Sequence, residues 1–573
     1  MVRSMKIKII LLLLFVSTFH IHGASQNPVF AKNGMVVSTS LQASEAGIEI
    51  LKKGGNAVDA AVATGFALAV TSSSNGNIGG GGFMVAYLAD GTTFTLDHRE
   101  TSPVSAHRDM YLNEHGKVIE NMSLKTRAAS GVPGTVDGLL TAWEDYGSGH
   151  ITLRELLTPA IKLAGKGFAL SHYEAQRLNN FRELFAANKA AAAIFIRKDN
   201  LPWKAGDLLI QKDLAKTMKR IASKGRNGFY TGKTADLIVE EMQRGNGLIA
   251  HEDLLNYESK YRSAVIGTFH GYEIISMGPP SSGGALLIHM LNMLEHYPLA
   301  SLGWNSSDYI HILTEVERRA YADRAEHLGD PDFWDVPLNM LLSKDYATKR
   351  IQNISMEKAS KSTDIFAGDL SGYESRETTH YSVVDKDGNV VSVTTTINLS
   401  YGSGILVPGA GFFLNNEMDD FSSKPGVPNV FGLIGNEANA IEPGKRPLSS
   451  MTPTIVLKNS NPFMIIGSSG GSTIITTTLQ SILNVIVHGM DVKEAVSFPR
   501  FHSQWLPDVI MTEPNGLSKD TIRNLKRMGH TIVPYHGTVR KPGYIGQANG
   551  IIINEKGFWG GGDTRGETSA IGY

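Results

Sequence analysis

The order of apolar and polar residues predicts helices in the first two thirds of the chain and mainly strands in the last third. Residues 44–71 are rich in alanine with apolar side chains at helical spacing, and the glycine pair 54–55 divides them into two helices. Residues 307–327 carry an apolar stripe, with charged residues such as Glu315 and Arg318 available for the other side. A Leu-Gly-Asp-Pro sequence ends this helix.

Two strand-like runs follow, at residues 380–384 and 390–396, and the turn between them contains Gly388-Asn389. If the strands pair at Val384 and Val390, Thr378 lies opposite Thr396. A two-residue turn would shift this register by one position. In either register the hairpin brings two threonine hydroxyls side by side.

Further strands are predicted at residues 454–458 and 463–467, with a helix at 472–487. The glycine run 79–82 leads into a strand and lacks a following Gly-Lys-Ser/Thr, so we interpret it as close backbone packing rather than a phosphate-binding loop. The whole pattern predicts an α/β protein with much antiparallel sheet.

The composition of the chain excludes several classes of protein and several kinds of site. The chain has 573 residues, a formal net charge of −1 and no cysteine. The length exceeds one average domain, although length is a soft guide. The charge argues against nucleic acid as a partner. The absence of cysteine excludes disulfides, thiolate metal sites and a cysteine nucleophile.

The first residues are typical of a secretory signal. Positive charges at Arg3, Lys6 and Lys8 precede a short apolar run, and small residues at 23–25 offer a cleavage site. The run is shorter than the roughly 20 residues of a membrane-spanning helix, and no later stretch is long and apolar enough. We expect a periplasmic or secreted protein without a stable membrane anchor. An uncleaved anchor or a buried strand is the alternative.

Thr378 is the strongest candidate nucleophile. It follows residues 358–377, whose polar, aperiodic composition suits an exposed and mobile tether. A threonine hydroxyl needs a base, and cleavage before Thr378 would supply one on the same residue. The freed α-amine titrates at about 7.7–8.0, so near neutral pH it can accept the hydroxyl proton.

A rival signal is the Gly-Ser-Ser-Gly-Gly sequence at 467–471, which matches a nucleophile elbow with Ser469 as the nucleophile. Its acid and base would have to follow it, as Asp491 or Asp508 and His530 or His536. An ordinary tight turn is the simpler interpretation. A third possibility is that the backbone N–H groups of Gly470 and Gly471 stabilise developing negative charge at a helix N-terminus.

Other polar residues are less specific when each is considered alone. The histidines show no metal-ligand spacing, so no metal site is expected. Arg99-Glu100 and the acidic residues 417–420 could be solvated charges, and residues 447–453 could be an ordinary loop.

Taken together, however, these motifs resemble one family. Thr378-Thr379-His380, Asn415 to Phe421, Pro447 to Met451 and Gly470-Gly471 occur in the order and spacing of the γ-glutamyltransferases (γ-glutamyltranspeptidases). These enzymes belong to the N-terminal-nucleophile hydrolases, and the likeness is to bacterial members. It covers nearly the whole chain after the signal. The resemblance implies a four-layer αββα sandwich and no cofactor.

The resemblance also implies a precursor that cuts itself between Glu377 and Thr378. Its parts would be a signal peptide (1–24), a large subunit (25–377) and a small catalytic subunit (378–573), the two subunits building one sandwich together. The enzyme would hydrolyse glutathione and other γ-glutamyl compounds, or transfer the γ-glutamyl group to amino acids and peptides, through an acyl-enzyme on Thr378.

The family's functional residues carry over to matching positions of this chain. Thr378 would be the nucleophile, Thr396 would orient it, and Gly470 and Gly471 would stabilise the oxyanion. The substrate α-carboxylate would be bound by Arg99, Ser449 and Ser450. The substrate α-ammonium would be bound by Asn398, Glu417 and Asp420.

Two positions depart from the bacterial pattern. Glu417 stands where glutamine is common, and Phe431 stands where some members carry a lid tyrosine. The first departure bears on how the ammonium is held, and the second on how well the site excludes water. Two alternatives to the family reading are a Ser469 hydrolase of the α/β type and an exported γ-glutamyl-binding protein without catalysis.

Overall fold

The computed structural model describes residues 27–365, 378–430, 432–536 and 543–573. The predicted signal peptide, the cleavage residue Glu377 and the lid residue Phe431 lie outside the described residues. Within them, every helix is too short or too polar to cross a bilayer.

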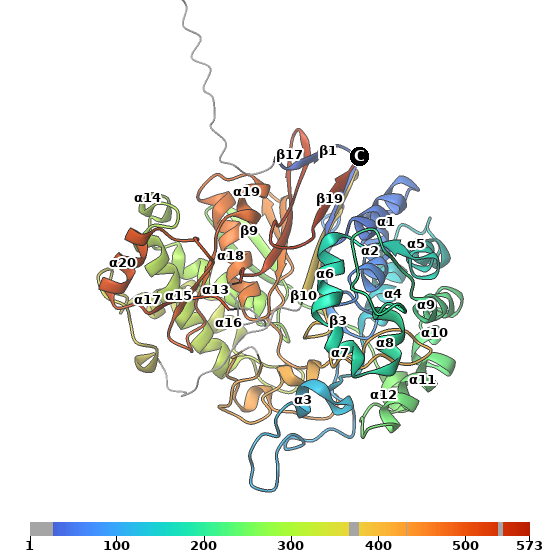
Figure 1. The fold of residues 1–573 in the computed structure, drawn as a ribbon. Coiled ribbons are helices and arrows are strands. Elements are labelled where there is room, and N and C mark those ends of the chain that lie inside the picture. Colours follow the sequence, from blue (N-terminus) through green and yellow to red (C-terminus); the bar gives the residue numbers. More distant parts are fainter. Residues whose placement is uncertain (1–26, 366–377, 431, 537–542) are drawn as a thin grey trace, which may run out of the picture.

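Two seven-stranded antiparallel sheets form the centre of the molecule (Figure 1). In the first sheet the strands lie in the order β1 (Val29–Ala31), β18 (Gly557–Gly562), β17 (Gln547–Asn554), β13 (Asn461–Ser469), β12 (Thr454–Lys458), β9 (Tyr272–Ser276) and β8 (Val265–Phe269). In the second sheet the order is β19 (Ser569–Gly572), β2 (Gly34–Ser38), β10 (Thr378–Asp385), β11 (Val390–Thr396), β3 (Gly81–Tyr87), β4 (Thr93–Asp97) and β7 (Lys260–Arg262).

Helices cover the outer face of each sheet. The second sheet is covered by a group that includes α1 (Leu41–Lys52), α2 (Ala57–Thr71), α4 (Thr135–Tyr146), α5 (Leu153–Lys166) and α9 (Lys212–Lys224). The first sheet is covered by α13 (Gly283–Leu294), α15 (Ser307–His327), α17 (Lys344–Ile351), α18 (Thr473–Ile486), α19 (Val492–Ser497) and α20 (Lys519–Met528). Two small sheets, β5–β6 (Phe168–Ala169, Leu208–Leu209) and β14–β15–β16 (Phe501–His502, Ile510–Thr512, Ile532–Pro534), lie outside the main ones.

Three apolar interfaces hold these four layers together. The middle one lies between the sheets and includes Val85, Val384 and Ile465. The outer two join each sheet to its helices. Alternate residues of β10 therefore enter different interfaces: Val383 packs toward α2 and Val384 toward the first sheet. The predicted αββα sandwich is confirmed.

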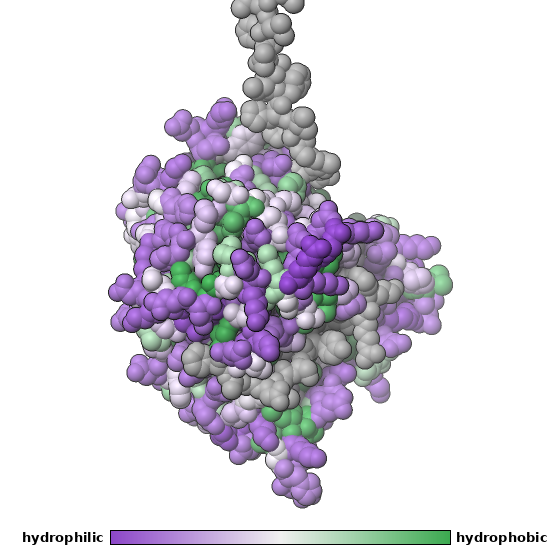
Figure 2. All heavy atoms as spheres, turned by 90° about the vertical axis from the view of Figure 1, so that its left-hand side faces the viewer, coloured by the Kyte–Doolittle hydropathy of each residue, from purple (hydrophilic) through white to green (hydrophobic). Residues whose placement is uncertain are grey.

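The outer side of the α17 and α20 layer is mostly hydrophilic, with apolar residues in small separate patches (Figure 2). On α20, for example, Leu525 is the buried residue and the rest of the helix is partly or fully exposed. This is the polar outer face expected of the last layer of a sandwich.

The sequence predicted several elements well. α1 and α2 are separated at Gly54-Gly55 as expected, and α15 spans the predicted residues 307–327. The prediction for the charged side of α15 was wrong, because Glu315, Arg318 and Arg319 are all buried. Arg319 Nη1 donates to Glu315 (2.8 Å), and Arg318 contacts Asp508 and Ser362 from distant parts of the chain.

The expectation of an exposed tether before Thr378 was also wrong for part of its described stretch. Ser362 is fully buried, and its hydroxyl donates to the carbonyl oxygen of Trp505 (2.5 Å). Its backbone N–H donates to Asp508 (2.8 Å). The rest of the predicted tether, residues 366–377, lies outside the described residues.

The glycine run 79–82 packs against backbone, as predicted. A Cβ at Gly80 would lie 2.0 Å from the carbonyl oxygen of Thr396, and one at Gly82 would lie 2.4 Å from that of Thr394. The absence of side chains therefore lets this segment lie directly against β11.

We predict that Gly80→Ala lowers stability by about 3 kcal/mol or more, because backbone atoms of β11 must move to admit the methyl group. Gly91→Ala is the matched control. Gly91 has a φ of +87°, and nothing lies within 4 Å of its Cβ position. An alanine there would therefore lose about 1 kcal/mol of stability from the backbone conformation, with no packing cost. Urea denaturation of the two variants tests this. Equal losses would contradict the packing explanation.

Candidate active site

The β10–β11 hairpin places Thr378 directly opposite Thr396, in the register that pairs Val384 with Val390. Both threonines are nearly inaccessible, with 6% and 3% of their surfaces exposed. The two strands are central in the second sheet, flanked by β2 and β3, so neither threonine lies at a free edge. The predicted register is confirmed.

Hydrogen bonds hold the two threonines from the side. The amide of Asn75 donates to the carbonyl oxygen of Thr378 (3.1 Å). The backbone N–H of Asn398 donates to the hydroxyl oxygen of Thr396 (2.8 Å). Asn398 has a φ of +69°, a conformation that is costly for a non-glycine residue and that here directs its side chain into the site.

The turn between β13 and α18 contains Gly470 and Gly471, with φ values of +136° and +58°. A side chain at Gly470 would collide with the hydroxyl of Thr473, at 2.3 Å. The turn enters the N-terminus of α18, where backbone N–H groups and the helix dipole favour negative charge. Both glycines lie in the walls of the hollows that contain Thr378.

Two hollows meet at Thr378. The inner pocket is narrow, with a cavity volume of about 20 Å³, and is lined by Arg99, Arg324, Thr378, Thr396, Asn398, Glu417, Asp420, Leu433, Leu448, Ser449, Ser450, Met451, Gly471 and Ile474. It therefore brings together all the predicted binding residues with both threonines and one glycine of the turn. The outer cleft has a cavity volume of about 440 Å³ and is lined by Asn75, Tyr173, Gln176, Arg177, Asn180, Phe181, Thr378, Ser400, Ser469, Gly470, Gly546, Gln547 and Arg565.

Arg99 is the centre of charge in the inner pocket. Its guanidinium donates to Glu417 and to Asp420, and Glu100 lies 3.7 Å away. Arg99, Glu100 and Glu417 are each at most 1% exposed. The interpretation of these residues as solvated charges was wrong, because the strand end at β4 and the short helix 417–420 carry them into the interior.

Three carboxyl groups lie around one guanidinium, so ionising all three would bury excess negative charge, which is unfavourable in free energy. Burial raises the pKa of Glu100 to about 7, although Arg99 opposes the shift. Burial also raises the pKa values of Glu417 and Asp420, again against Arg99. For Arg99, burial alone would lower the pKa, but Glu417 and Asp420 raise it above its ordinary value. The guanidinium stays charged while protons are shared among the carboxyls.

The pocket also presents groups that can take up a ligand. Oδ1 of Asn398 and Oε2 of Glu417 are buried acceptors without a hydrogen-bond partner among the described residues. The hydroxyl oxygen of Ser449 accepts from the N–H of Met451 (3.1 Å), which leaves its hydrogen available to donate. The pocket thus contains both acceptors and a donor that a ligand could engage.

Sequence reasoning missed one charged member of the pocket. Arg324 on α15 lines it and donates to the hydroxyls of Ser282 (2.9 Å) and Ser450 (3.4 Å). Burial lowers the pKa of Arg324 to about 10. Sequence reasoning also gave no role to Glu100, which lies beside Arg99 but outside the lining of the pocket.

The alternative with Ser469 as nucleophile is not supported by the geometry. Ser469 does end a strand before a helix, but its proposed partners are engaged elsewhere. Asp508 accepts from Ser362, Asp491 caps α19, and His530 lies 2.7 Å from His311. His536 belongs to the exposed residues.

His311, Glu315 and His530 are the one group of potential metal ligands that lie close together among the described residues, with ligand atoms within 4.8 Å. Nε2 of His311 faces the carbonyl oxygen of Ser355 (2.6 Å), so it donates there and Nδ1 accepts from His530. Glu315 is paired with Arg319. Most ligand atoms of the cluster are therefore engaged by protein contacts, with Nδ1 of His530 the exception, and the cluster lines neither hollow.

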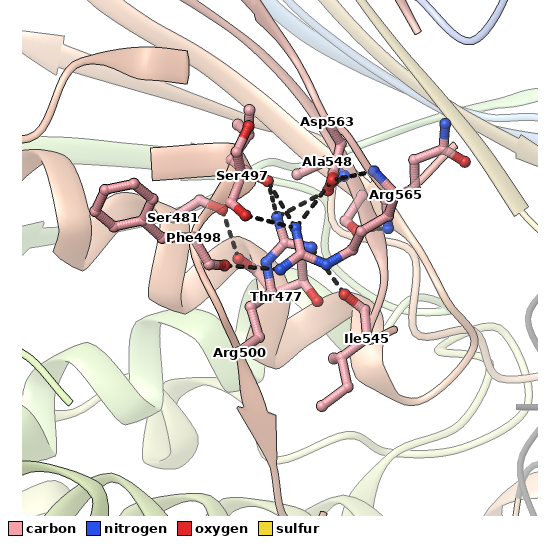
Figure 3. A network of polar contacts seen from close by, with 12 residues as sticks. Thr477, Ser481, Ser497, Phe498, Arg500, Ile545, Ala548, Asp563 and Arg565 are labelled. Carbon is pink, nitrogen blue, oxygen red and sulfur yellow. Dashed lines mark hydrogen bonds and ion pairs between the residues drawn. The ribbon is translucent and has the colours of Figure 1, made fainter. Parts of the chain in front are cut away.

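A network of charges fixes one wall of the outer cleft (Figure 3). Arg500 donates to Asp563 (2.9 Å) and to the carbonyl oxygen of Ile545 (2.8 Å). Arg565 donates to Asp563 and to the carbonyl oxygen of Phe498 (2.7 Å). These contacts hold the start of β17, and with it Gly546 and Gln547, beside Thr378.

Comparison with known proteins now decides the family. The model of the gamma-glutamyltranspeptidase family matches residues 43–573. The chain belongs to this family. It is 47% identical over 506 residues to a glutathione hydrolase proenzyme of Escherichia coli, covering 88% of this chain and 87% of that protein.

Solved structures agree with the fold. A cephalosporin acylase from Bacillus halodurans superposes with a TM-score of 0.83 at 25% identity, covering 98% of this chain and 99% of that one. Gamma-glutamyltranspeptidase of Helicobacter pylori gives a TM-score of 0.56 at 44% identity, covering 60% of this chain and 96% of that one. The fold is therefore shared with a cephalosporin acylase as well as with a gamma-glutamyltranspeptidase.

Proposed function

We propose that this chain is the precursor of an exported γ-glutamyltransferase that also hydrolyses glutathione. The observation that carries the proposal is the position of Thr378, at the mouth of a pocket built for one positive and one negative charge. The names of the relatives, glutathione hydrolase proenzyme and gamma-glutamyltranspeptidase, support it.

Maturation begins with cleavage between Glu377 and Thr378. The Thr378 hydroxyl attacks the preceding carbonyl carbon, the C–N bond breaks, and the resulting ester is hydrolysed by water. The products are a large subunit (25–377) and a small subunit (378–573), after loss of the signal peptide 1–24. The Helicobacter structure supports this division, because nearly all of that chain matches 60% of this one, about the share of the large subunit.

Cleavage creates the base that catalysis needs. The new α-amine of Thr378 takes the hydroxyl proton, and the hydroxyl oxygen attacks the γ-carbonyl carbon of the donor. Thr396, opposite Thr378 on β11, orients the hydroxyl. Gly470 and Gly471 stabilise the oxyanion with backbone N–H groups, and one such donor contributes about 3–4 kcal/mol. The donor's amine leaves, and water or a second amine releases the acyl group.

The donor's free α-amino and α-carboxyl groups exchange with the ion pairs that Arg99 makes with Glu417 and Asp420. Arg99 turns from Glu417 and Asp420 to the α-carboxylate, with Ser449 and Ser450 donating beside it. Glu417, Asp420 and Asn398 then accept from the α-ammonium. A ligand that carried one of the two charges alone would leave buried charge without a partner, which is strongly unfavourable. The pocket therefore selects a γ-glutamyl head over other acyl groups.

The most direct test changes the nucleophile. We predict that Thr378→Ala gives one uncut, inactive chain, whereas the parent gives two bands on a denaturing gel and hydrolyses γ-glutamyl-4-nitroanilide. Ser469→Ala is the control and should still be cut. An uncut parent, an active Thr378→Ala chain, or a cut Ser469→Ala chain without activity would each contradict the assignment.

A second prediction concerns pH. The α-ammonium of the donor needs ionised carboxyls. Burial raises the pKa of Glu100 to about 7 and raises the pKa values of Glu417 and Asp420 above their ordinary values, so the cluster gains negative charge as the pH rises. The kcat/KM of the parent should rise from pH 6 to 8, as the Thr378 amine also loses its proton. Glu417→Gln removes one of these carboxyls and leaves the Thr378 amine unchanged. The kcat/KM of this variant should therefore rise less steeply with pH than that of the parent. Identical profiles would exclude Glu417 from ammonium binding.

A further inference from the structure

The strand that begins with Thr378 is flanked by β2 along only part of its length. Among the described residues, β2 pairs with β10 from Ser382 to Asp385, and it ends at Ser38, just before the chain turns into α1. The side of β10 next to His380 and Thr378 must therefore find its hydrogen bonds elsewhere.

The hairpin register shows which backbone groups face that side. The N–H of Asp385 donates to the carbonyl oxygen of Asn389 across the hairpin (3.1 Å), so the backbone groups of Asp385 point toward β11. Because these directions alternate along an antiparallel strand, the carbonyl groups of His380 and Thr378 point away from β11. Thr378 and Thr396 thus form a non-hydrogen-bonded pair, in which the Cα atoms are about 4.5 Å apart and the side chains are close. Their hydroxyls are brought together, but Thr378 gains no backbone hydrogen bond from β11.

Two side-chain amides take the place of β2 at this end of β10. Asn549 on β17 donates to the carbonyl oxygen of His380 (2.8 Å), and Asn75 donates to that of Thr378 (3.1 Å). Asn75 lies in the loop after α2, is 5% exposed and lines the outer cleft. It therefore holds the backbone of the candidate nucleophile from the side that β11 does not reach.

The orientation of the Asn75 amide is determined by its other contacts. Its Oδ1 accepts from the hydroxyl of Ser72 (2.9 Å) and from the backbone N–H of Gly76 (3.0 Å). A backbone N–H can only donate, so Oδ1 must face Gly76 and the NH₂ group must face Thr378. The loop is packed tightly, since a Cβ at Gly76 would lie 2.7 Å from the carbonyl oxygen of Leu68 on α2. Asn75 is thus a fixed donor directed at one acceptor.

Cleavage before Thr378 makes this hydrogen bond more important. A chain terminus is poorly ordered unless contacts hold it, and the new N-terminal residue has lost the peptide bond that preceded it. A hydrogen bond to its carbonyl oxygen fixes the peptide group that follows Thr378. The position of the Cα atom, which carries both the hydroxyl-bearing side chain and the α-amine, is fixed with it.

We propose that Asn75 is a positioning residue for the nucleophile: its amide holds the carbonyl group of Thr378 so that the hydroxyl meets the γ-carbonyl carbon of the donor. This role rests on the proposed function. Asn75 makes and breaks no covalent bond, and it lies outside the lining of the inner pocket. Binding of the γ-glutamyl head therefore does not depend on it.

The test replaces the amide donor with an acceptor of the same size. In Asn75→Asp the carboxylate still accepts from Ser72 and Gly76, but it turns a second acceptor toward the carbonyl oxygen of Thr378. The kcat of the processed enzyme for γ-glutamyl-4-nitroanilide should fall roughly ten- to hundredfold, because a shift of about 1 Å in a reacting group can cost 10²-fold. The competitive inhibition constant of L-glutamate should stay unchanged. Self-cleavage should also be slower, because the same hydroxyl attacks in that step.

Asn75→Ala removes the donor without adding a charge, so it should show the same separation of kcat from binding, with a smaller fall in kcat. This variant decides the question if Asn75→Asp does not fold. Asn549→Asp is the matched control, because it makes the same change at the neighbouring carbonyl group on the same side of β10. It should lower the melting temperature and leave the kcat of the processed enzyme unchanged.

Three results would overturn the proposal. They are an unchanged kcat in the folded Asn75 variants, a rise in the inhibition constant of L-glutamate that matches the fall in kcat, and an equal fall in kcat for Asn549→Asp. If the processed parent does not cleave γ-glutamyl-4-nitroanilide, the proposed function itself fails, which is a distinguishable result.

Discussion

The antiparallel pairing of β10 with β11 is the constraint on which the rest of the site depends. A slip of one residue would turn Thr378 and Thr396 to opposite faces of the sheet. The register is held by burial on both faces, since Val383 and Val384 enter different apolar interfaces. It is also held by the glycine run, which lies directly against the end of β11 that carries Thr396.

Around this hairpin, the charged groups come from distant segments and pair with one another. Arg99, at the end of β4, is bonded to Glu417 and Asp420, more than 300 residues later in the chain. A buried charge without a partner costs far more free energy than a paired one, so the carboxyls around Arg99 offset the cost of burying its guanidinium. Under the proposed function, the two charges of the substrate would exchange with these ion pairs, and recognition would depend on both charges together.

Local pattern was sufficient to predict the hairpin, the division of α1 from α2 and the bounds of α15, because turn residues and periodicity determine these within a few residues of the chain. The local pattern did not predict which charged side chains are buried. Glu315, Arg318 and Arg319 look like a solvated face, yet Asp508 and Ser362 cover that side of α15 through contacts over a long sequence separation. The same limit concealed Arg324, whose place in the pocket depends on how α15 packs, and the position of Glu100 beside Arg99. Resemblance to a family located most of the candidate site, but not the charge balance within it.

The central claim is that Thr378 becomes the N-terminal residue that carries the acyl group. Rapid acid quenching of the processed enzyme with glutathione, followed by peptide mapping with mass spectrometry, tests it directly. The account predicts a small subunit that begins at Thr378, with one γ-glutamyl group on that residue. A different N-terminus, or a γ-glutamyl group on Ser469 or any other residue, would contradict it.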